Sequence, residues 1–238
     1  MACRLGLPTH FVWVCFLWGG LWACATPPRM PMELAEQGRL ARALKNQPRF
    51  LRISYFVTPF FADESKHLLS PVNPAWLHVL QHPDGMPVPP GDIEALLPAA
   101  MPVRILKVEF PTALAIKERL PYSPRTRPWV YVAIQNASKP LILVLPNTLK
   151  NTEEFEAELN RYLTPLNPST QIAEFSVDEQ TAIRSKEALP GISAEALEMA
   201  LGYPESKTIA FEGEQKIETW HWGGGQKTVS LRGGRVAR

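Results

Sequence analysis

Short runs of apolar residues, separated by prolines and glycines, fill the middle of the chain and predict a β-rich region. The stretch 50–61 is rich in β-branched and aromatic residues, which is typical of a strand. The stretch 102–112 alternates apolar and polar residues, with a break in register near Leu106. Two further runs, 128–134 and 140–146, each open on a proline, as strands often do. Because the last run is apolar throughout, we expect it at the centre of a sheet, covered on both faces.

Two helical patterns lie on either side of these strands. Residues 33–46 place leucines at helical spacing, interrupted by Gly38. The stretch NTEEFEAELNRYL predicts a second helix, which Asn151 or Thr152 can cap and which Pro165 ends. Acidic residues fill the first turn of this helix, where they complement the positive end of the helix dipole.

The C-terminal region predicts two more helices with clear start and stop signals. Ser176 and Glu179 form a capping box at the start of the first. Ser193 can cap the second, whose apolar residues repeat at helical spacing. Gly202 stands where a helix C-terminal glycine belongs, and Pro204 follows it.

Three strands follow these helices, with the sequences KTIAF, KIETWHW and KTVSLRG. The connections EGEQ and GGGQ are short glycine turns of the hairpin type. Trp220 and Trp222 share one face of the middle strand because side chains alternate along a strand. We expect this face to pack on the helices.

This C-terminal order resembles the SmpA/OmlA (BamE-like) domain of outer-membrane lipoproteins. The residues that carry the resemblance are GIS-AEAL, LGYPE, ETWHW and TVSLRGGRV, over about the final quarter of the chain. The resemblance implies a two-helix, three-stranded antiparallel unit in a periplasm-facing lipoprotein that supports outer-membrane integrity and β-barrel assembly. The long region in front of it departs from the family pattern, and its opening strands resemble an SH3-like barrel.

The first residues predict a secretory signal. Arg4 precedes an apolar stretch, 5–23, and no acidic residue occurs before Glu33. The tetrapeptide Leu21-Trp22-Ala23-Cys24 resembles the lipobox of bacterial lipoproteins, although Trp22 is larger than that position usually holds. The resemblance implies that Cys24 is lipidated and becomes the first residue after cleavage.

Two other interpretations of the N-terminal region stay open. Ala23-Cys24-Ala25 also fits an ordinary signal cleavage site, which would release a soluble protein that begins at Thr26. The apolar stretch could also remain as a membrane helix, but it is short for a bilayer and contains Pro8 and a glycine pair. The prolines after Cys24 favour an extended tether.

Cysteine content and charge narrow the location and the partners. Cys3 and Cys15 leave with the signal, so the mature chain has no disulfide. In the lipoprotein family, an aspartate after the lipidated cysteine can mark inner-membrane retention, and Ala25 therefore favours the outer membrane. The formal net charge is +2 without a basic stripe, so no nucleic-acid partner is predicted.

No convincing catalytic, cofactor or metal site emerges from the sequence. His78 and His82 have helical spacing but lack the intervening glutamate of a zinc protease helix. The chain has no G-x-S-x-G motif, and the run 223–225 lacks the Lys-Ser/Thr of a phosphate-binding loop. These observations predict a protein that is not an enzyme.

The stretch SPRTRPWVY is the strongest surface candidate. Arg125, Arg127 and Trp129 are residue types that dominate interface energetics, and they could meet an envelope protein, a cell-wall acid or lipid headgroups. The alternative is a loop that leads into a strand, with Trp129 in the core. Both interpretations are open at this point.

The sequence as a whole predicts an α+β protein in four segments. These are a signal peptide (1–23), a tether with a short helix (24–48), a β-rich unit that ends in a helix (49–168) and a BamE-like unit (169–238). The predicted function is that of a non-enzymatic lipoprotein with a structural or assembly role, anchored by lipid in the outer membrane and facing the periplasm. The alternatives are a binding module for a cell-wall or protein ligand, and a secreted soluble protein.

Overall fold

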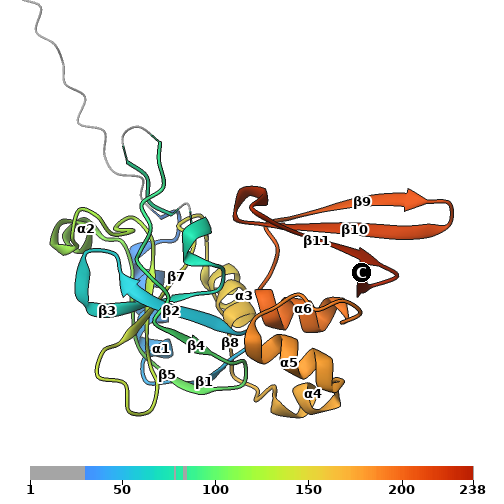
Figure 1. The fold of residues 1–238 in the computed structure, drawn as a ribbon. Helices are drawn as coiled ribbons and strands as arrows, with labels where there is room; N and C mark the ends of the chain where they lie inside the picture. The colour runs from blue at the N-terminus through green and yellow to red at the C-terminus, as the bar shows by residue number, and fades with distance from the viewer. Residues whose placement is uncertain (1–29, 78, 83–84, 238) are drawn as a thin grey trace, which may run out of the picture.

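The computed structural model describes residues 30–77, 79–82 and 85–237, and the chain is a mixed α+β protein with two sheets (Figure 1). The predicted α+β class is therefore confirmed. The predicted signal peptide, lipobox and Cys24 lie outside the described residues. Among the helices that the structure describes, none has the length and apolar character needed to cross a membrane.

We call the described residues up to 168 the first unit and those from 169 the second unit. The first unit is built on one eight-stranded sheet with the order β4-β2-β3-β7-β6-β5-β1-β8. Neighbouring strands are antiparallel, except for the parallel pair β3 and β7. The sheet is open at β4 and β8, so the SH3-like barrel suggested by the opening strands does not form. Its strands are β1 (Pro48–Leu51), β2 (Tyr55–Phe60), β3 (Asp63–Ser70), β4 (Ala95–Leu97), β5 (Pro102–Glu109), β6 (Trp129–Ala133), β7 (Leu141–Val144) and β8 (Leu163–Thr164).

The stretch 50–61, predicted as one strand, belongs to two strands on opposite sides of the sheet order. Between them the backbone leaves the ladder: the Arg52 N–H donates to the Tyr162 carbonyl and the Ser54 N–H to the Met199 carbonyl, both at 2.9 Å. The register break near Leu106 is confirmed as an irregularity in the pairing of β5 with β6. The long-range backbone contacts that divide β1 from β2 leave no local mark in the sequence.

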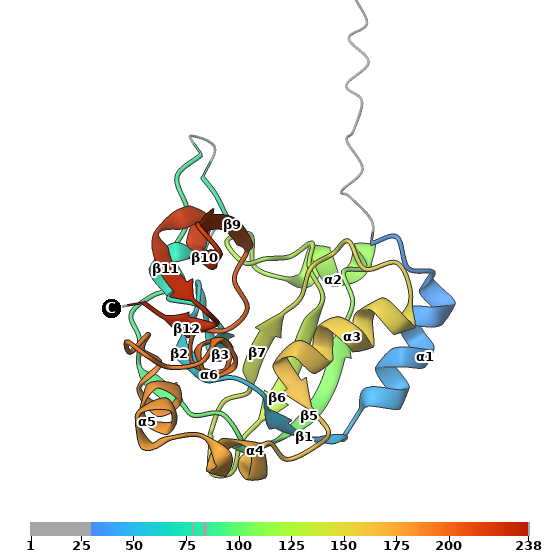
Figure 2. The same cartoon turned by 90° about the vertical axis from the view of Figure 1, so that its right-hand side faces the viewer.

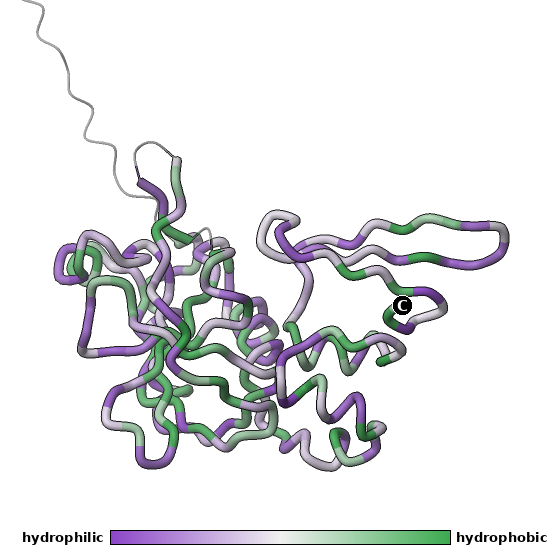
Figure 3. Tube along the Cα trace, in the orientation of Figure 1, coloured by the Kyte–Doolittle hydropathy of each residue, from purple (hydrophilic) through white to green (hydrophobic). Residues whose placement is uncertain are grey.

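The central position of the apolar run 140–146 is confirmed. β7 is the fourth strand of the sheet, and its side chains are buried on both faces. Leu143 packs in the larger cluster with α1 (Leu34–Leu44) and α3 (Thr152–Tyr162), which lie on one face of the sheet (Figure 2). Ile142 packs on the opposite face with Trp129. Hydrophobic residues accordingly gather in the inner strands, whereas the outer loops are mostly hydrophilic (Figure 3).

The helix α3 and two shorter elements complete the first unit. The predicted cap of α3 is confirmed, because the Asn151 side chain accepts a hydrogen bond from the Glu154 N–H. α2 (Ala113–Glu118) follows β5, and Thr112 caps it. The single turn η1 (Pro74–Trp76) follows β3.

The second unit contains three helices and a four-stranded antiparallel sheet, one helix and one strand more than predicted. The extra helix, α4, and the extra strand, β12, are too short to show a period in the sequence. The capping box of Ser176 and Glu179 and the Ser193 cap are confirmed. The elements are α4 (Ser169–Glu174), α5 (Val177–Ser185), α6 (Ala194–Leu201), β9 (Ser206–Glu212), β10 (Gln215–Trp222), η2 (Gly223–Gly225), β11 (Lys227–Arg232) and β12 (Arg235–Val236).

The second sheet has one covered and one uncovered part. Trp220 and Trp222 are buried in the cluster that includes α5 and α6, which confirms the predicted inner face. The glycine run 223–225 connects β10 to β11, as predicted. The hairpin of β9 and β10 extends beyond the helices (Figure 1), and Ile209 and Phe211 on β9 are exposed there.

Candidate functional site

The predicted surface residue Trp129 lies in the core of the first unit. Its side chain is buried, and its indole N–H donates to the Pro124 carbonyl at 3.0 Å. The Arg119 guanidinium stacks on the ring, with its carbon 3.8 Å from the ring centroid. Of the two interpretations of this stretch, the structure therefore supports the loop that leads into a strand with Trp129 in the core.

The loop around Arg125 and Arg127 is held from beneath by Arg119. One Arg119 nitrogen donates to the carbonyls of both residues, at 2.7 and 2.8 Å. The two side chains are partly buried, and burial lowers the pKa of Arg127. Arg127 and Glu205 both line a cavity of about 190 Å³ between the two units. A role for Arg125 and Arg127 in partner binding stays a prediction.

A larger cavity lies at the junction of the two units and centres on Lys186. This residue follows α5 in the left-handed conformation, with φ 61°, and turns the chain back toward the first unit. Its ammonium donates to the Pro71 carbonyl at 2.7 Å and to the Ala200 carbonyl at 2.9 Å. Lys186 therefore links Pro71, the residue after β3, with α6. Burial lowers the pKa of its amine to about 7.

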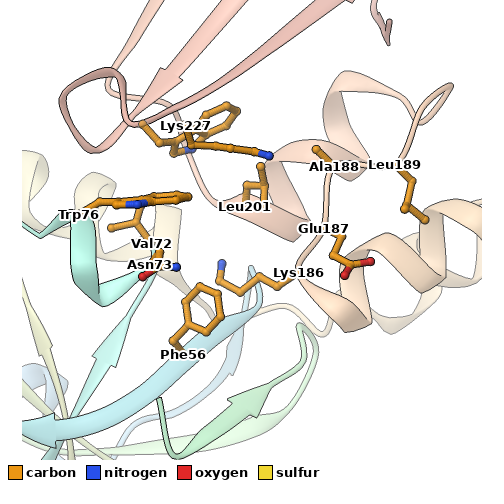
Figure 4. Close-up of a pocket in the computed structure, with 11 residues that line it drawn as sticks. Phe56, Val72, Asn73, Trp76, Lys186, Glu187, Ala188, Leu189, Leu201 and Lys227 are labelled. Atoms are coloured by element: carbon orange, nitrogen blue, oxygen red, sulfur yellow. The ribbon is translucent and has the colours of Figure 1, made fainter. Parts of the chain in front are cut away.

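We call this cavity the junction pocket. Its volume is about 370 Å³, within the usual range for small-molecule sites. Aromatic and aliphatic side chains from both units line it, together with four polar side chains: Asn73, Lys186, Glu187 and Lys227 (Figure 4). The apolar lining is Phe56, Val72, Trp76, Leu201 and Trp222, and the polar groups used below are Asn73, Lys186 and Lys227.

Close packing fixes the indole wall of the junction pocket. Trp76 belongs to η1, which begins where the Asn73 side chain accepts a hydrogen bond from the Ala75 N–H. On the other side, Trp76 contacts Gly223 in the turn after β10. A Cβ at Gly223 would lie 2.3 Å from the Trp76 Cβ, so only glycine fits there. The η1 turn of the first unit is therefore clamped against the second sheet.

The second unit supplies a matching wall. The Trp222 indole N–H donates to the Gly202 carbonyl at 3.1 Å, which fixes the ring beside the end of α6. Gly202 has φ 83°, and a Cβ there would lie 3.2 Å from Ile53 and 3.3 Å from the Pro71 carbonyl. The predicted helix-ending glycine thus also allows the two units to approach closely.

Hydrogen-bond donors dominate the polar lining of the junction pocket. The ammonium groups of Lys186 and Lys227 both point into the space beside Trp76 and Leu201, whereas the Glu187 carboxylate points away from it (Figure 4). Within the described residues, no carboxylate forms a salt bridge with either ammonium. The site is therefore positively charged, apolar in its walls and poor in acceptors.

Sequence reasoning did not find these residues. Lys186 stands at a helix end, where a lysine is usually solvated, and its burial depends on carbonyls of distant segments. Phe56 and Trp76 lie in stretches that predict only strands and turns. The one signal in the sequence is the glycine run that begins at Gly223. This glycine is needed for its positive φ and also for its close contact with Trp76.

Comparison of the chain with models of protein families, with curated proteins and with solved structures gives no match. In the part of the chain that the structure describes, no group of three or more His, Cys, Asp or Glu side chains is placed to hold a metal ion. His78 lies outside the described residues. The chemistry of the junction pocket is thus set by its lysines, its amide and its aromatic walls.

Proposed function

We propose that this protein is a non-enzymatic, lipid-anchored lipoprotein of the bacterial envelope that binds a ligand at the junction of its two units. The junction pocket is the observation that carries the binding role. It has the volume of a ligand site, fixed aromatic walls and two ammonium groups without a carboxylate partner among the described residues. This corresponds to the binding module among the alternatives that the sequence leaves open.

The anchor in this proposal is a lipid on Cys24. The sequence Leu21-Trp22-Ala23-Cys24 supports it, as do the prolines that precede Met30. Ala25 favours the outer membrane, with the two units facing the periplasm. Kinship of residues 169–238 with the BamE-like family is part of the same proposal, supported by the residues LGYPE and ETWHW.

Mass spectrometry of the intact protein, purified from membranes of a bacterial host, tests the anchor. We expect a chain that begins at an acylated Cys24, and a Cys24→Ser variant that is no longer lipidated. A Cys15→Ser variant is the matched control and should remain lipidated. A mature chain that begins at Thr26 without lipid would contradict the anchor.

Pocket variants test the binding role separately from the anchor. A Trp76→Ala variant removes one wall, and an Ile209→Ser variant changes an exposed residue on β9 that does not line the junction pocket. Small molecules extracted with the native protein, identified by mass spectrometry, should be lost from the first variant and kept by the second. Equal envelope defects from both variants, with no bound molecule in the native protein, would instead support a structural or assembly role.

A further inference from the structure

We propose that the junction pocket binds a small organic anion, namely a carboxylate carried on a flat, apolar body. This inference rests on the proposed binding role and adds the class of ligand. Three features of the described residues carry it: the unfinished hydrogen bonding of Lys186, the donors that surround it and the shape of the apolar walls.

The first feature is the unused capacity of the Lys186 ammonium. A protonated lysine has three N–H donors, and the carbonyls of Pro71 and Ala200 take two of them. The end of the side chain points into the junction pocket (Figure 4), and among the described residues no further acceptor is hydrogen-bonded to its remaining donor. An anion in the junction pocket would complete the hydrogen bonding of a cation that is already buried.

The second feature is that the neighbouring polar groups are donors too. Lys227 reaches the junction pocket from β11 and points toward the same space. The Asn73 oxygen already accepts from the Ala75 N–H, so its amide nitrogen is the end left for a ligand. These three donor groups would bind a carboxylate strongly, because the lysines form charge-assisted hydrogen bonds with it, whereas they would repel a cationic ligand.

The third feature is the flat, apolar lining. Trp76 presents its ring to the junction pocket beside Leu201, and its position is fixed by contact with Gly223. Phe56 lies below the ammonium of Lys186, 5.1 Å from the ring centroid to the nitrogen. Aromatic walls of this kind favour a ring or another planar body by burial of apolar surface and by offset stacking.

Protonation of Lys186 should be coupled to binding of the anion. The other charged groups at the junction pocket are Lys227, from β11, and Glu187, which neighbours Lys186 and points away. Burial lowers the pKa of Lys186 to about 7, and a bound carboxylate would raise it again. Above pH 7 the anion must therefore bind with uptake of a proton, so affinity should fall about tenfold for each unit of pH.

The test uses the full chain with its native N-terminus, purified in detergent, and isothermal titration calorimetry. The probe is 2-naphthoate, and the uncharged 2-naphthalenemethanol is its control. We expect the carboxylate to bind at pH 6.5 and the alcohol to bind at least tenfold more weakly. Lys186→Met and Lys227→Met should each weaken naphthoate roughly 10- to 100-fold, the loss of one charged hydrogen bond, while exposed Lys150→Met should leave its affinity unchanged.

The outcomes separate failure of the ligand class from failure of the binding role. Equal affinity for the alcohol and the carboxylate, or affinity that Lys186→Met leaves unchanged, would overturn the anion and keep the pocket as a binding site. Absence of binding by both probes to the folded protein, with no molecule found in the native preparation, would overturn both. Folding of each variant is checked by its unfolding curve, and Lys186→Arg provides a second variant that retains the positive charge.

Discussion

Two buried cations, Arg119 in the first unit and Lys186 at the junction, show how differently this protein accommodates charge. The Arg119 side chain is 3% exposed and pairs with Glu109 at 2.9 Å. Its remaining nitrogens donate to carbonyls, and its plane stacks on Trp129. Lys186 is also buried but has two carbonyls as partners, no carboxylate and a cavity in front of it.

The difference separates structural from functional use of a buried charge. Four of the five N–H donors of Arg119 have protein acceptors, a carboxylate among them, and its plane packs on Trp129, so its role is to hold its loop in place. Burial removes water from the Lys186 ammonium, and two carbonyls replace only part of that hydration. An anionic ligand would therefore stabilise this charge further. A buried charge that faces a cavity is thus better evidence for a site than an exposed Arg/Trp motif in a sequence.

The largest expected effect comes from removing the fully compensated cation. Arg119→Met should lower the free energy of unfolding by about 3–5 kcal/mol, because it removes the buried one of the two cations that pair with Glu109 and leaves the carbonyls of the loop without their donor. Urea unfolding of the purified protein measures it. Lys107→Met is the matched control: Lys107 also pairs with Glu109, but its side chain is 52% exposed, so its loss should cost less than about 1 kcal/mol. Equal losses would show that Arg119 is no better compensated than a surface lysine.

The second prediction uses the pH dependence of stability to test whether Lys186 is under-compensated. Its pKa is about 7 in the folded protein and 10.5 for a free lysine, so between these values the unfolded chain binds more protons. Stability should therefore rise with pH in this window, by about 2 kcal/mol from pH 7.5 to 9.0 relative to Lys186→Met. Denaturant unfolding at both pH values measures this, and the comparison cancels groups that titrate in both proteins. Parallel curves would mean that Lys186 is compensated as well as Arg119.

The sequence predicts the elements of both units better than the place where the units meet. Strand patterns, the capping box of Ser176 and Glu179 and the Gly202 terminus follow local rules, so they could be predicted. The boundary between β1 and β2 could not, because it depends on backbone contacts with Tyr162 and Met199, far along the chain. Shape and register of a sheet are set by such pairings, which also explains why the strand pattern resembles a barrel although the eight-stranded sheet is open.

The candidate site was harder to predict for the same reason. A lysine, a tryptophan and a glycine become a site only when Lys186, Trp76 and Gly223 are brought together from three distant segments. The Arg/Trp motif left two interpretations open because Trp129 is buried by residues from other segments, Arg119 and Phe60 among them. Residue type alone does not distinguish an exposed anchor from a core aromatic.

The third prediction asks whether the junction is packed as closely as the core around Arg119. Gly223→Ala and Gly224→Ala place a Cβ at similar positive φ, 57° and 64°, so the backbone strain should be alike. Only the first Cβ meets Trp76, at 2.3 Å, whereas nothing lies within 4 Å of the second. We expect Gly223→Ala to lose about 1–2 kcal/mol more than Gly224→Ala in urea unfolding. Equal losses would indicate that the wall of the junction pocket is loosely held.

The smallest expected effect contrasts two charges at opposite ends of α5: Glu179, in its first turn, and Lys186, which follows its last residue. Burial by itself raises the pKa of Glu179. Hydrogen bonds from Ser193 and Ser176 together have the larger, opposite effect and lower this pKa to about 2. A lowered carboxyl pKa stabilises the fold above the unfolded value of 4.5, and this is lost as pH falls toward 2. From pH 5 to pH 3 the protein should therefore lose about 1 kcal/mol more than its Glu179→Gln variant in urea unfolding.

The control for this experiment is Asp178→Asn, which removes an exposed carboxylate from the same first turn of α5. Its loss should change stability by only a few tenths of a kcal/mol, the scale of an exposed charge near a helix dipole. If Glu179→Gln and Asp178→Asn behave alike, the hydrogen bonds to Glu179 add nothing beyond its charge. If they differ as expected, the charge of Glu179 in the first turn of α5 is stabilised by hydrogen bonds within the protein. The charge of Lys186, after the last turn, has two carbonyl partners and remains open to an anionic ligand.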